Sequence, residues 1–213
     1  MAEAQEGLGG ALRRLVPSFY LPSFVVTWGD VVYAPVLSLL AVQLHSGGSK
    51  AAAGTAAAAT AAASMLCQVP AALFFAELGP RLTLALGSAI SALGSLAAWV
   101  AAGANSFPGF IAALCGMGGG RALIRMASVE YIRTAAPVAC RGRCTALSGG
   151  VHRAAAIIGP LVGGVVARLY GLSAPLLIGA GFKLLGAAIF LATVPAGRGA
   201  QHSQHAQRRV MPC

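Results

Sequence analysis

The chain has 213 residues, of which 57% are hydrophobic and only 9% are charged, and its mean hydropathy is +0.77. Soluble domains carry about 25% charged residues, so this chain cannot cover a water-exposed surface, and a lipid bilayer is its expected surrounding. The net charge of +10 would suit nucleic acid. However, the arginines stand at the ends of apolar segments instead of forming a basic patch, and nucleic acid is therefore not an expected partner.

Six segments are apolar over about 20 residues or more, the length at which a helix crosses the hydrocarbon core of a bilayer. In chain order they cover residues 18–44, 51–76, 82–104, 108–130, 144–168 and 171–194. The sequence therefore predicts an all-α polytopic membrane protein with one six-helix transmembrane domain at 18–194. A cytoplasmic N-terminal segment at 1–17 precedes this domain, and a disordered, basic cytoplasmic tail at 195–213 follows it.

The first span carries Asp30 about midway along its length. A charged side chain at the bilayer centre costs at least about 2.5–3.5 kcal/mol, so such residues usually face a cavity and serve a function. Two roles are open for Asp30. Its carboxyl group could carry protons in a coupled transporter, or it could form an ion pair with Arg121, Arg125 or Arg153 that helps assemble the bundle.

The second span is rich in alanine. Its small residues Ala52, Ala56, Thr60 and Ser64 recur every four positions and form a stripe along one helix face. Such a stripe predicts a close contact with another helix. The alternative is that the alanines reflect a compositional bias alone.

The fourth and fifth spans carry the other charged residues that we assign to a cavity. Arg121 and Arg125 are four residues apart in the fourth span, so they share one helix face. Arg153 lies in the fifth span, on the side facing away from that span's glycines. Three positive charges and the negative charge of Asp30 give the predicted cavity a charge of +2, which favours anionic solutes or anionic groups on them.

The fifth span also contains the stretch IIGPLVGG at residues 157–164. Ala155, Gly159 and Gly163 fall on one helix face, where the lack of large side chains lets another backbone approach. Pro160 has no N–H to donate, so one carbonyl of the preceding turn loses its helical partner. We therefore expect a kinked helix that is packed closely on its glycine face.

The sixth span carries Lys183 midway along its length. This lysine is expected either to extend its side chain to a membrane interface or to contact another subunit. No catalytic motif is present: the stretch GMGGGR at 116–121 lacks the lysine of a phosphate-binding loop and follows no strand. The histidines and cysteines show no spacing typical of metal ligands. The sequence therefore predicts no enzyme, no cofactor and no metal site.

The basic residues of the connecting segments indicate the orientation in the membrane. If the N-terminus is inside, the three outer segments hold only two basic residues, Lys50 and Arg168. The inner segments then hold Arg13, Arg14, Arg81, Arg133, Arg141, Arg143, Arg198, Arg208 and Arg209. Cytoplasmic segments carry the excess of Lys and Arg, so both termini are predicted to be cytoplasmic.

Two stretches resemble motifs of a known family. CRGRCTALSGGVHRAAAIIGPLVGG combines an R-G-R loop with a glycine-spaced helix; the matching residues are Arg141, Gly142, Arg143, Gly159, Pro160, Gly163 and Gly164. FAELGPRLTLALG resembles an inner-loop motif often written D-R-x-G-R; here the corresponding residues are Glu77, Gly79 and Arg81, and Ala76 stands at the aspartate position. With these motifs, residues 18–194 resemble the N-terminal six-helix half of a major facilitator superfamily transporter.

The resemblance implies a secondary transporter with its solute site between two such halves. The leading hypothesis is proton-coupled transport or efflux of a small organic solute, because the fifth-span motif is similar to that of proton-coupled drug antiporters. The positive charge of the predicted cavity indicates that this solute is anionic. The alternative is a membrane protein that does not transport, either a truncated remnant or an assembly subunit. The expected partners are the lipid bilayer, a small-molecule solute and a second six-helix half, which is either another copy or a separate chain.

Overall fold

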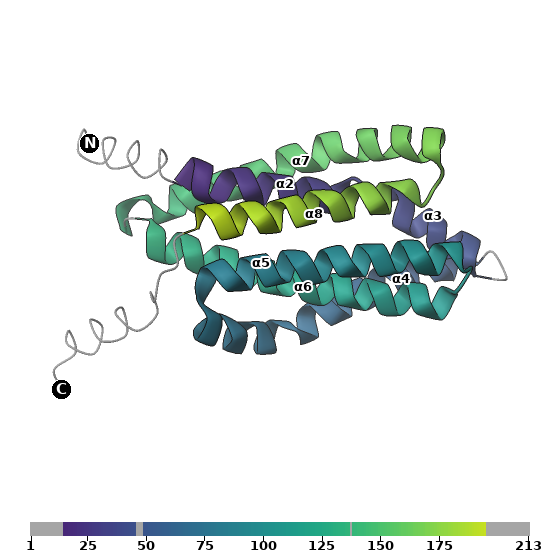
Figure 1. Cartoon of the computed structure of the whole chain (residues 1–213), viewed down its shortest axis with the longest axis horizontal. Coiled ribbons are helices and arrows are strands. Elements are labelled where there is room, and N and C mark those ends of the chain that lie inside the picture. Colours follow the sequence, from purple (N-terminus) through teal and green to yellow (C-terminus); the bar gives the residue numbers. More distant parts are fainter. Residues whose placement is uncertain (1–14, 46–48, 137, 195–213) are drawn as a thin grey trace.

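The computed structural model describes residues 15–45, 49–136 and 138–194. The regular secondary structure in these ranges is helical, and the helices run side by side in an elongated bundle (Figure 1). Five stretches within the described ranges are long and apolar enough to cross a membrane: Val16–Leu44, Gln68–Gly103, Phe107–Ala135, Arg141–Tyr170 and Ala174–Thr193. The prediction of an all-α, polytopic membrane protein is confirmed.

The first span consists of three consecutive pieces, the π-helical η1 (Val16–Tyr20), α2 (Leu21–Val31) and α3 (Ala34–Leu44). A bend at Val32 and Tyr33 separates α2 from α3. Pro35 stands in the first turn of α3 and has no N–H that could bond the carbonyl of Val31. The interruption of the helix therefore falls directly after Asp30.

The second and third predicted spans meet at a sharp turn within α5 (Gln68–Gly103). After α4 (Lys50–Leu66) and the single turn residue Cys67, the chain enters α5. Gly79 interrupts α5 with φ 73° and ψ 176°, a conformation essentially restricted to glycine, and Pro80 follows it. The chain reverses there (Figure 1), so α4 and the start of α5 form the second predicted span. With 17 residues, α4 is too short to count as a span by itself. For this reason five helical stretches, and not the six predicted spans, are long enough to cross a membrane.

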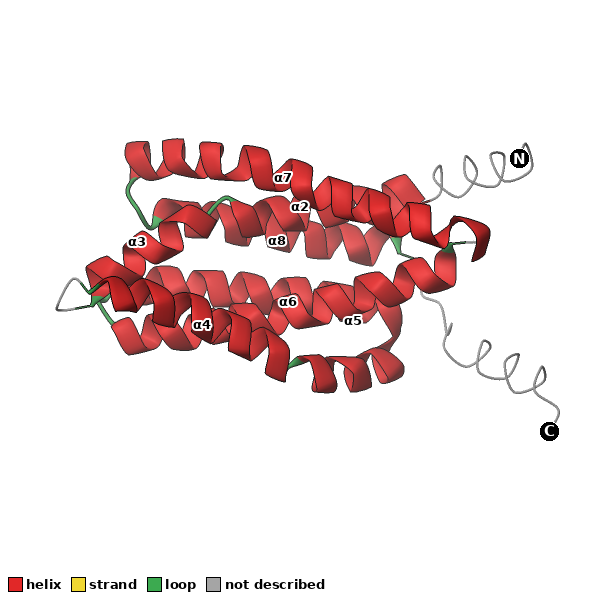
Figure 2. Cartoon of the chain, turned by 180° about the vertical axis from the view of Figure 1, so that it is seen from behind, coloured by secondary structure: helices red, strands yellow, loops and turns green. Residues whose placement is uncertain are grey.

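The remaining helices are α6 (Phe107–Ala135), the short 3-10 helix η2 (Val138–Cys140), α7 (Arg141–Tyr170) and α8 (Ala174–Thr193). The hydroxyl of Ser106 begins α6 by accepting a hydrogen bond from the backbone N–H of Gly109. Gly171, with φ 94°, ends α7. Seen from behind, α7 lies along α2 at one side of the bundle, and α4 lies over α6 at the other (Figure 2).

Small residues let these helices pack closely. Gly87 on α5 and Gly120 on α6 meet so tightly that a Cβ on Gly120 would lie 2.6 Å from the carbonyl oxygen of Gly87. Gly118 on α6 contacts the backbone of α4 at Thr60 and Ser64. The predicted small-residue stripe of the second span therefore does make a close helix contact, and α6 is its partner.

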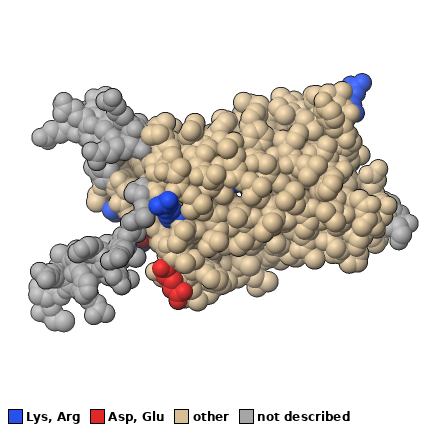
Figure 3. All heavy atoms as spheres, viewed as in Figure 1, with Lys and Arg blue, Asp and Glu red and all other residues tan. Residues whose placement is uncertain are grey.

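The first and last described residues lie at the same end of the bundle, where one buried cluster joins Leu15, Cys140 and Val194. Figure 3 shows a nearly uncharged surface between the two ends, as expected for a face in contact with lipid. The chain is thus an integral, multi-pass membrane protein. The predicted tail at 195–213 lies outside the described residues, as does the N-terminal segment up to residue 14.

Candidate functional site

Asp30 on α2 is the centre of an ion cluster inside the bundle. One of its carboxylate oxygens, Oδ1, lies 2.8 Å from Nζ of Lys183 and 3.3 Å from Nε of Arg121. The hydroxyl of Tyr33 donates a hydrogen bond of 2.7 Å to the same oxygen. Asp30 therefore pairs with Arg121, as one sequence hypothesis expected, but also with Lys183, which the sequence did not assign to this site.

Lys183 on α8 is fully buried, with 0% of its side chain exposed. Its ammonium donates to the hydroxyl of Tyr33 at 2.6 Å, to Oγ of Ser91 at 2.7 Å and to Oγ of Ser95 at 3.1 Å. Both sequence alternatives for Lys183, an interface and another subunit, are therefore wrong. The reason is that its counter-ion, Asp30, lies on the adjacent helix.

Two glycines bring this lysine and its counter-ion together. A Cβ on Gly29 would lie 2.8 Å from the carbonyl oxygen of Gly179, and one on Gly179 would lie 2.6 Å from the carbonyl oxygen of Gly29. Since α2 and α8 touch through their backbones here, the adjacent Asp30 and Lys183 are within ion-pair distance. The sequence signal was present: Gly179 and Gly186 flank Lys183 at helical spacing and place it on the packed face of α8.

A cavity of about 590 Å³ opens between α2, α6 and α7. The four residues that the sequence assigned to transport, Asp30, Arg121, Arg125 and Arg153, all line it. Arg125 and Arg153 are exposed, and neither has an ion-pair partner within the described part of the chain. The structure thus gathers the predicted residues around one space, and it leaves two of the arginines available to a solute.

The cavity wall also contains polar groups that the sequence did not single out. They are Ser23, Thr27, Ser128, Ser148 and His152. Oγ1 of Thr27 on α2 and Nδ1 of His152 on α7 lie 3.4 Å apart, so a polar contact joins the two helices across the cavity. Isolated serines and a histidine in a long helix carry no signal of their own, and only the fold shows that they face the arginines.

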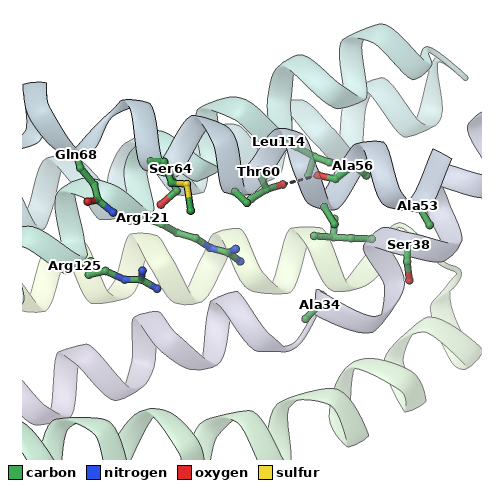
Figure 4. Close-up of a pocket in the computed structure, with 14 residues that line it drawn as sticks. Ala34, Ser38, Ala53, Ala56, Thr60, Ser64, Gln68, Leu114, Arg121 and Arg125 are labelled. Carbon is green, nitrogen blue, oxygen red and sulfur yellow. Dashed lines mark hydrogen bonds between the residues drawn. The ribbon is translucent and has the colours of Figure 1, made fainter. Parts of the chain in front are cut away.

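A second cavity, of about 450 Å³, lies between α3, α4 and α6. Figure 4 shows Arg121 and Arg125 extending from α6 toward the space that the alanines of α4 border. The two cavities share three lining residues, which are the two arginines and Ala34 at the start of α3. This second space was not predicted from the sequence, because the α4 part of its wall consists largely of alanines, which are also typical of a packed helix face.

The glycine face of α7 packs against the interrupted part of the first span. Ala155, Gly159 and Gly163 are buried, and a Cβ on Gly163 would overlap the carbonyl oxygen of Val32. The helix continues through Pro160 without a break. Gly164 does not share this role: it is exposed, and a Cβ there would meet nothing within 4 Å.

The inner-loop motifs lie at the end of the bundle, away from both cavities. Gly79 forms the chain reversal described above, and the exposed Glu77 precedes it. The guanidinium of Arg81 donates to the backbone carbonyl of Leu191 near the end of α8. In the second motif, Nε of Arg141 donates to the carbonyl of Ala136 at 3.3 Å. The other members, Gly142 and Arg143, are exposed at the start of α7.

A bundle of membrane-length helices with charged side chains gathered around internal cavities is the architecture of a membrane transporter. The family model of the Major Facilitator Superfamily matches residues 19–211. The chain belongs to this superfamily, and its described part forms one six-helix half. Members of the family are membrane transporters and are typically not enzymes. A comparison with curated proteins found no match for the chain.

Proposed function

We propose that this chain is half of a secondary transporter whose larger cavity binds a small organic solute through an anionic group. The observation that carries the proposal is the charge balance of the cavity wall. Arg121, Arg125 and Arg153 line it, and Asp30 is the one acidic residue among the described wall residues. Because Asp30 also pairs with Lys183, a net positive charge remains in the cavity, and this attracts anions.

Arginine is well suited to this task. Its planar guanidinium group stays protonated and can bind a carboxylate, sulfonate or phosphate through two parallel hydrogen bonds. Arg125 extends from α6 and Arg153 from α7, so an anion held by both would connect two consecutive α-helices on opposite sides of the cavity opening. Such a bridge would give solute binding a direct means of moving α7 relative to α6.

Proton coupling is the second part of the proposal. In the structure Asp30 is in an ion pair with both Lys183 and Arg121, an arrangement that supports a role in bundle assembly. A coupling role requires that this carboxylate exchange a proton during transport. Uptake measured with and without an imposed pH gradient, in the wild-type chain and in Asp30→Asn, separates the two roles. Coupling predicts gradient-driven uptake that Asp30→Asn abolishes while the protein remains folded.

The transport assay uses the full chain reconstituted in liposomes and a panel of radiolabelled organic carboxylates with the matching neutral amides. We expect uptake of carboxylates and not of amides, and a decrease of at least about tenfold in Arg125→Gln, which removes one charged hydrogen-bond partner. The control is Arg133→Gln, because Arg133 pairs with Glu130 at the end of α6 and lines neither cavity. If no solute of the panel moves in the wild-type chain, the alternative of a non-transporting membrane protein is favoured.

We also propose that a second six-helix half completes the solute site, as another copy or as a separate chain. Support comes from α7, which exposes Arg153 and His152 at its middle, where contact with lipid would be costly. Light scattering of the protein in nanodiscs distinguishes a monomer from a dimer. A monomer that transports would overturn this part of the proposal.

The orientation with both termini in the cytoplasm is likewise proposed. The bundle end that holds Leu15 and Val194 also carries Arg81, Arg141 and Arg143, and basic residues concentrate on the cytoplasmic side. Labelling of a cysteine introduced at Arg143 should require a membrane-permeant reagent in intact cells. Labelling by an impermeant reagent would reverse the orientation.

A further inference from the structure

We infer that the smaller cavity receives the apolar body of the solute, so that the substrates are amphipathic organic monoanions. This inference rests on the proposed function, because the anionic group of the solute is held by arginines of the larger cavity. It adds a second compartment with its own chemistry, which selects for the rest of the molecule.

The two cavities share one charged boundary. Arg121 and Arg125 line both of them, together with Ala34. Of the two arginines, Arg121 is already held by Asp30 and by the hydroxyl of Tyr33 at 3.2 Å. Arg125 is exposed and has no ion-pair partner among the described residues. An anion bound at Arg125 would therefore stand where the compartments meet, and the rest of the solute must extend into one of them.

The walls of the two compartments differ in the charged residues that they contain. Apart from the two arginines, the smaller cavity has no charged residue in its lining, and alanines of α4 make up much of its wall (Figure 4). Two of its hydroxyl groups are already used within their own helices: Ser38 donates to the carbonyl of Pro35 at 3.2 Å and Thr60 to that of Ala56 at 2.9 Å. The remaining uncharged polar residues of the wall are Ser64 and Gln68, so the alanine face of α4 is the part of the wall that suits an apolar body.

The larger compartment has three further charged or titratable residues in its wall, Asp30, His152 and Arg153. Burying an apolar group against such residues leaves their charges without water, which is unfavourable. An amphipathic anion consequently gains most when its anionic group faces the larger cavity and its apolar body fills the smaller one. The smaller volume, about 450 Å³, lies within the range of about 300–1,000 Å³ typical of small-molecule sites.

The room for this body depends on the short side chains of α4. Ala53, Ala57 and Ala61 recur every four residues along the cavity wall, and any larger side chain at these positions would occupy the space. Ala58 is exposed like Ala57 but lines neither cavity. The pair Ala57→Phe and Ala58→Phe therefore makes the same change on the same helix, once into the cavity and once away from it.

The test is calorimetric titration of the full chain in nanodiscs with butyrate, hexanoate and octanoate, with empty nanodiscs subtracted to remove partition into lipid. Octanamide serves as the neutral analogue. For the wild-type chain we expect the affinity to rise about three- to fourfold for each added methylene group, because each is removed from water. In Ala57→Phe we expect octanoate to bind at least about tenfold more weakly and butyrate to bind as before. Ala58→Phe should match the wild type.

The outcomes separate this inference from the proposed function. Octanamide binding as tightly as octanoate would overturn the anion site itself. Carboxylate binding that does not depend on chain length would overturn the apolar compartment and leave the anion site intact. Chain-length dependence that survives in Ala57→Phe would overturn its location. Ala61→Leu, checked for folding by size-exclusion chromatography, repeats the test with a smaller side chain if Ala57→Phe does not fold.

Discussion

Lys183 and Arg125 are both basic residues in the middle of membrane helices, and the fold gives them opposite environments. Lys183 is fully buried, lies 2.8 Å from Asp30 and donates hydrogen bonds to three hydroxyl groups. Arg125 is exposed to both cavities and has no ion-pair partner among the described residues. A charge that the protein has satisfied serves assembly, whereas an unsatisfied one in a cavity wall is available to a ligand.

Tyr33 stands at the border between these two environments. Its hydroxyl donates to Asp30 and accepts hydrogen bonds from both Lys183 and Arg121. It also lies in the bend that interrupts the first span, where α7 packs closely. The buried network and the cavity wall are therefore connected through one residue, and substitutions on either side should show how strongly each contributes to stability.

The largest effect is expected for Asp30→Asn. The substitution keeps the shape of the side chain but leaves the ammonium of Lys183 buried without a counter-ion. Removing one partner of a buried ion pair costs about 3–5 kcal/mol, so the thermal unfolding midpoint of the purified protein should fall markedly. The double variant Asp30→Asn with Lys183→Met should recover much of this loss, since no unpaired charge remains. A double variant no more stable than Asp30→Asn would contradict this account of the network.

The second prediction concerns the contact that holds α7 against the border region. A Cβ on Gly163 would overlap the carbonyl oxygen of Val32, which is backbone and cannot rotate away. Gly163→Ala should therefore lower the free energy of unfolding by about 3 kcal/mol. Gly164→Ala is the matched control: nothing lies within 4 Å, and replacing glycine within a helix should stabilise the protein by about 0.5–1 kcal/mol. Equal effects in the two variants, measured by thermal unfolding, would show that α7 does not pack as described.

The third prediction compares two buried tyrosines. Tyr33→Phe removes a hydroxyl that contacts charged groups, and hydrogen bonds of that kind are worth about 1.5–3 kcal/mol. Tyr20→Phe removes a neutral hydrogen bond of 2.8 Å to the carbonyl of Cys144, worth about 0.5–1.5 kcal/mol. Tyr33→Phe should therefore destabilise the protein more than Tyr20→Phe does. If thermal unfolding showed Tyr20→Phe to be the less stable variant, the ion cluster would not depend on the hydroxyl of Tyr33.

Much of the fold follows from hydropathy alone, because a membrane helix needs about 20 apolar residues whatever surrounds it. The reversal inside α5 was also within reach of the sequence, since Gly79 and Pro80 stand between two apolar segments. The bend in the first span was harder to predict. Pro35 marks it, but in other membrane helices proline is tolerated without a break, as it is at Pro160 in α7.

The site could be predicted as a set of residues but not as an arrangement. Mid-span charge identified Asp30, Arg121, Arg125 and Arg153, because ionisable groups in a bilayer are expensive wherever they lie. The same reasoning found Lys183 but assigned it wrongly, since the contact between α2 and α8 depends on glycines from distant parts of the chain. The smaller cavity was missed because alanine gives the same signal in a packed face and in a cavity wall.

The smallest effect on stability is expected for Arg125→Gln. Because Arg125 has no ion-pair partner in the described part of the chain, its removal breaks no contact and lessens the positive charge shared with Arg121. The free energy of unfolding should change by no more than about 0.5 kcal/mol, even though carboxylate uptake should fall. Lys183→Gln, a matched removal of charge on α8, should destabilise the protein clearly, because the carboxylate of Asp30 loses its closest partner. If both variants unfold at the same temperature, the burial and ion pairing of a basic residue do not tell us whether its charge stabilises the fold or is available to a solute.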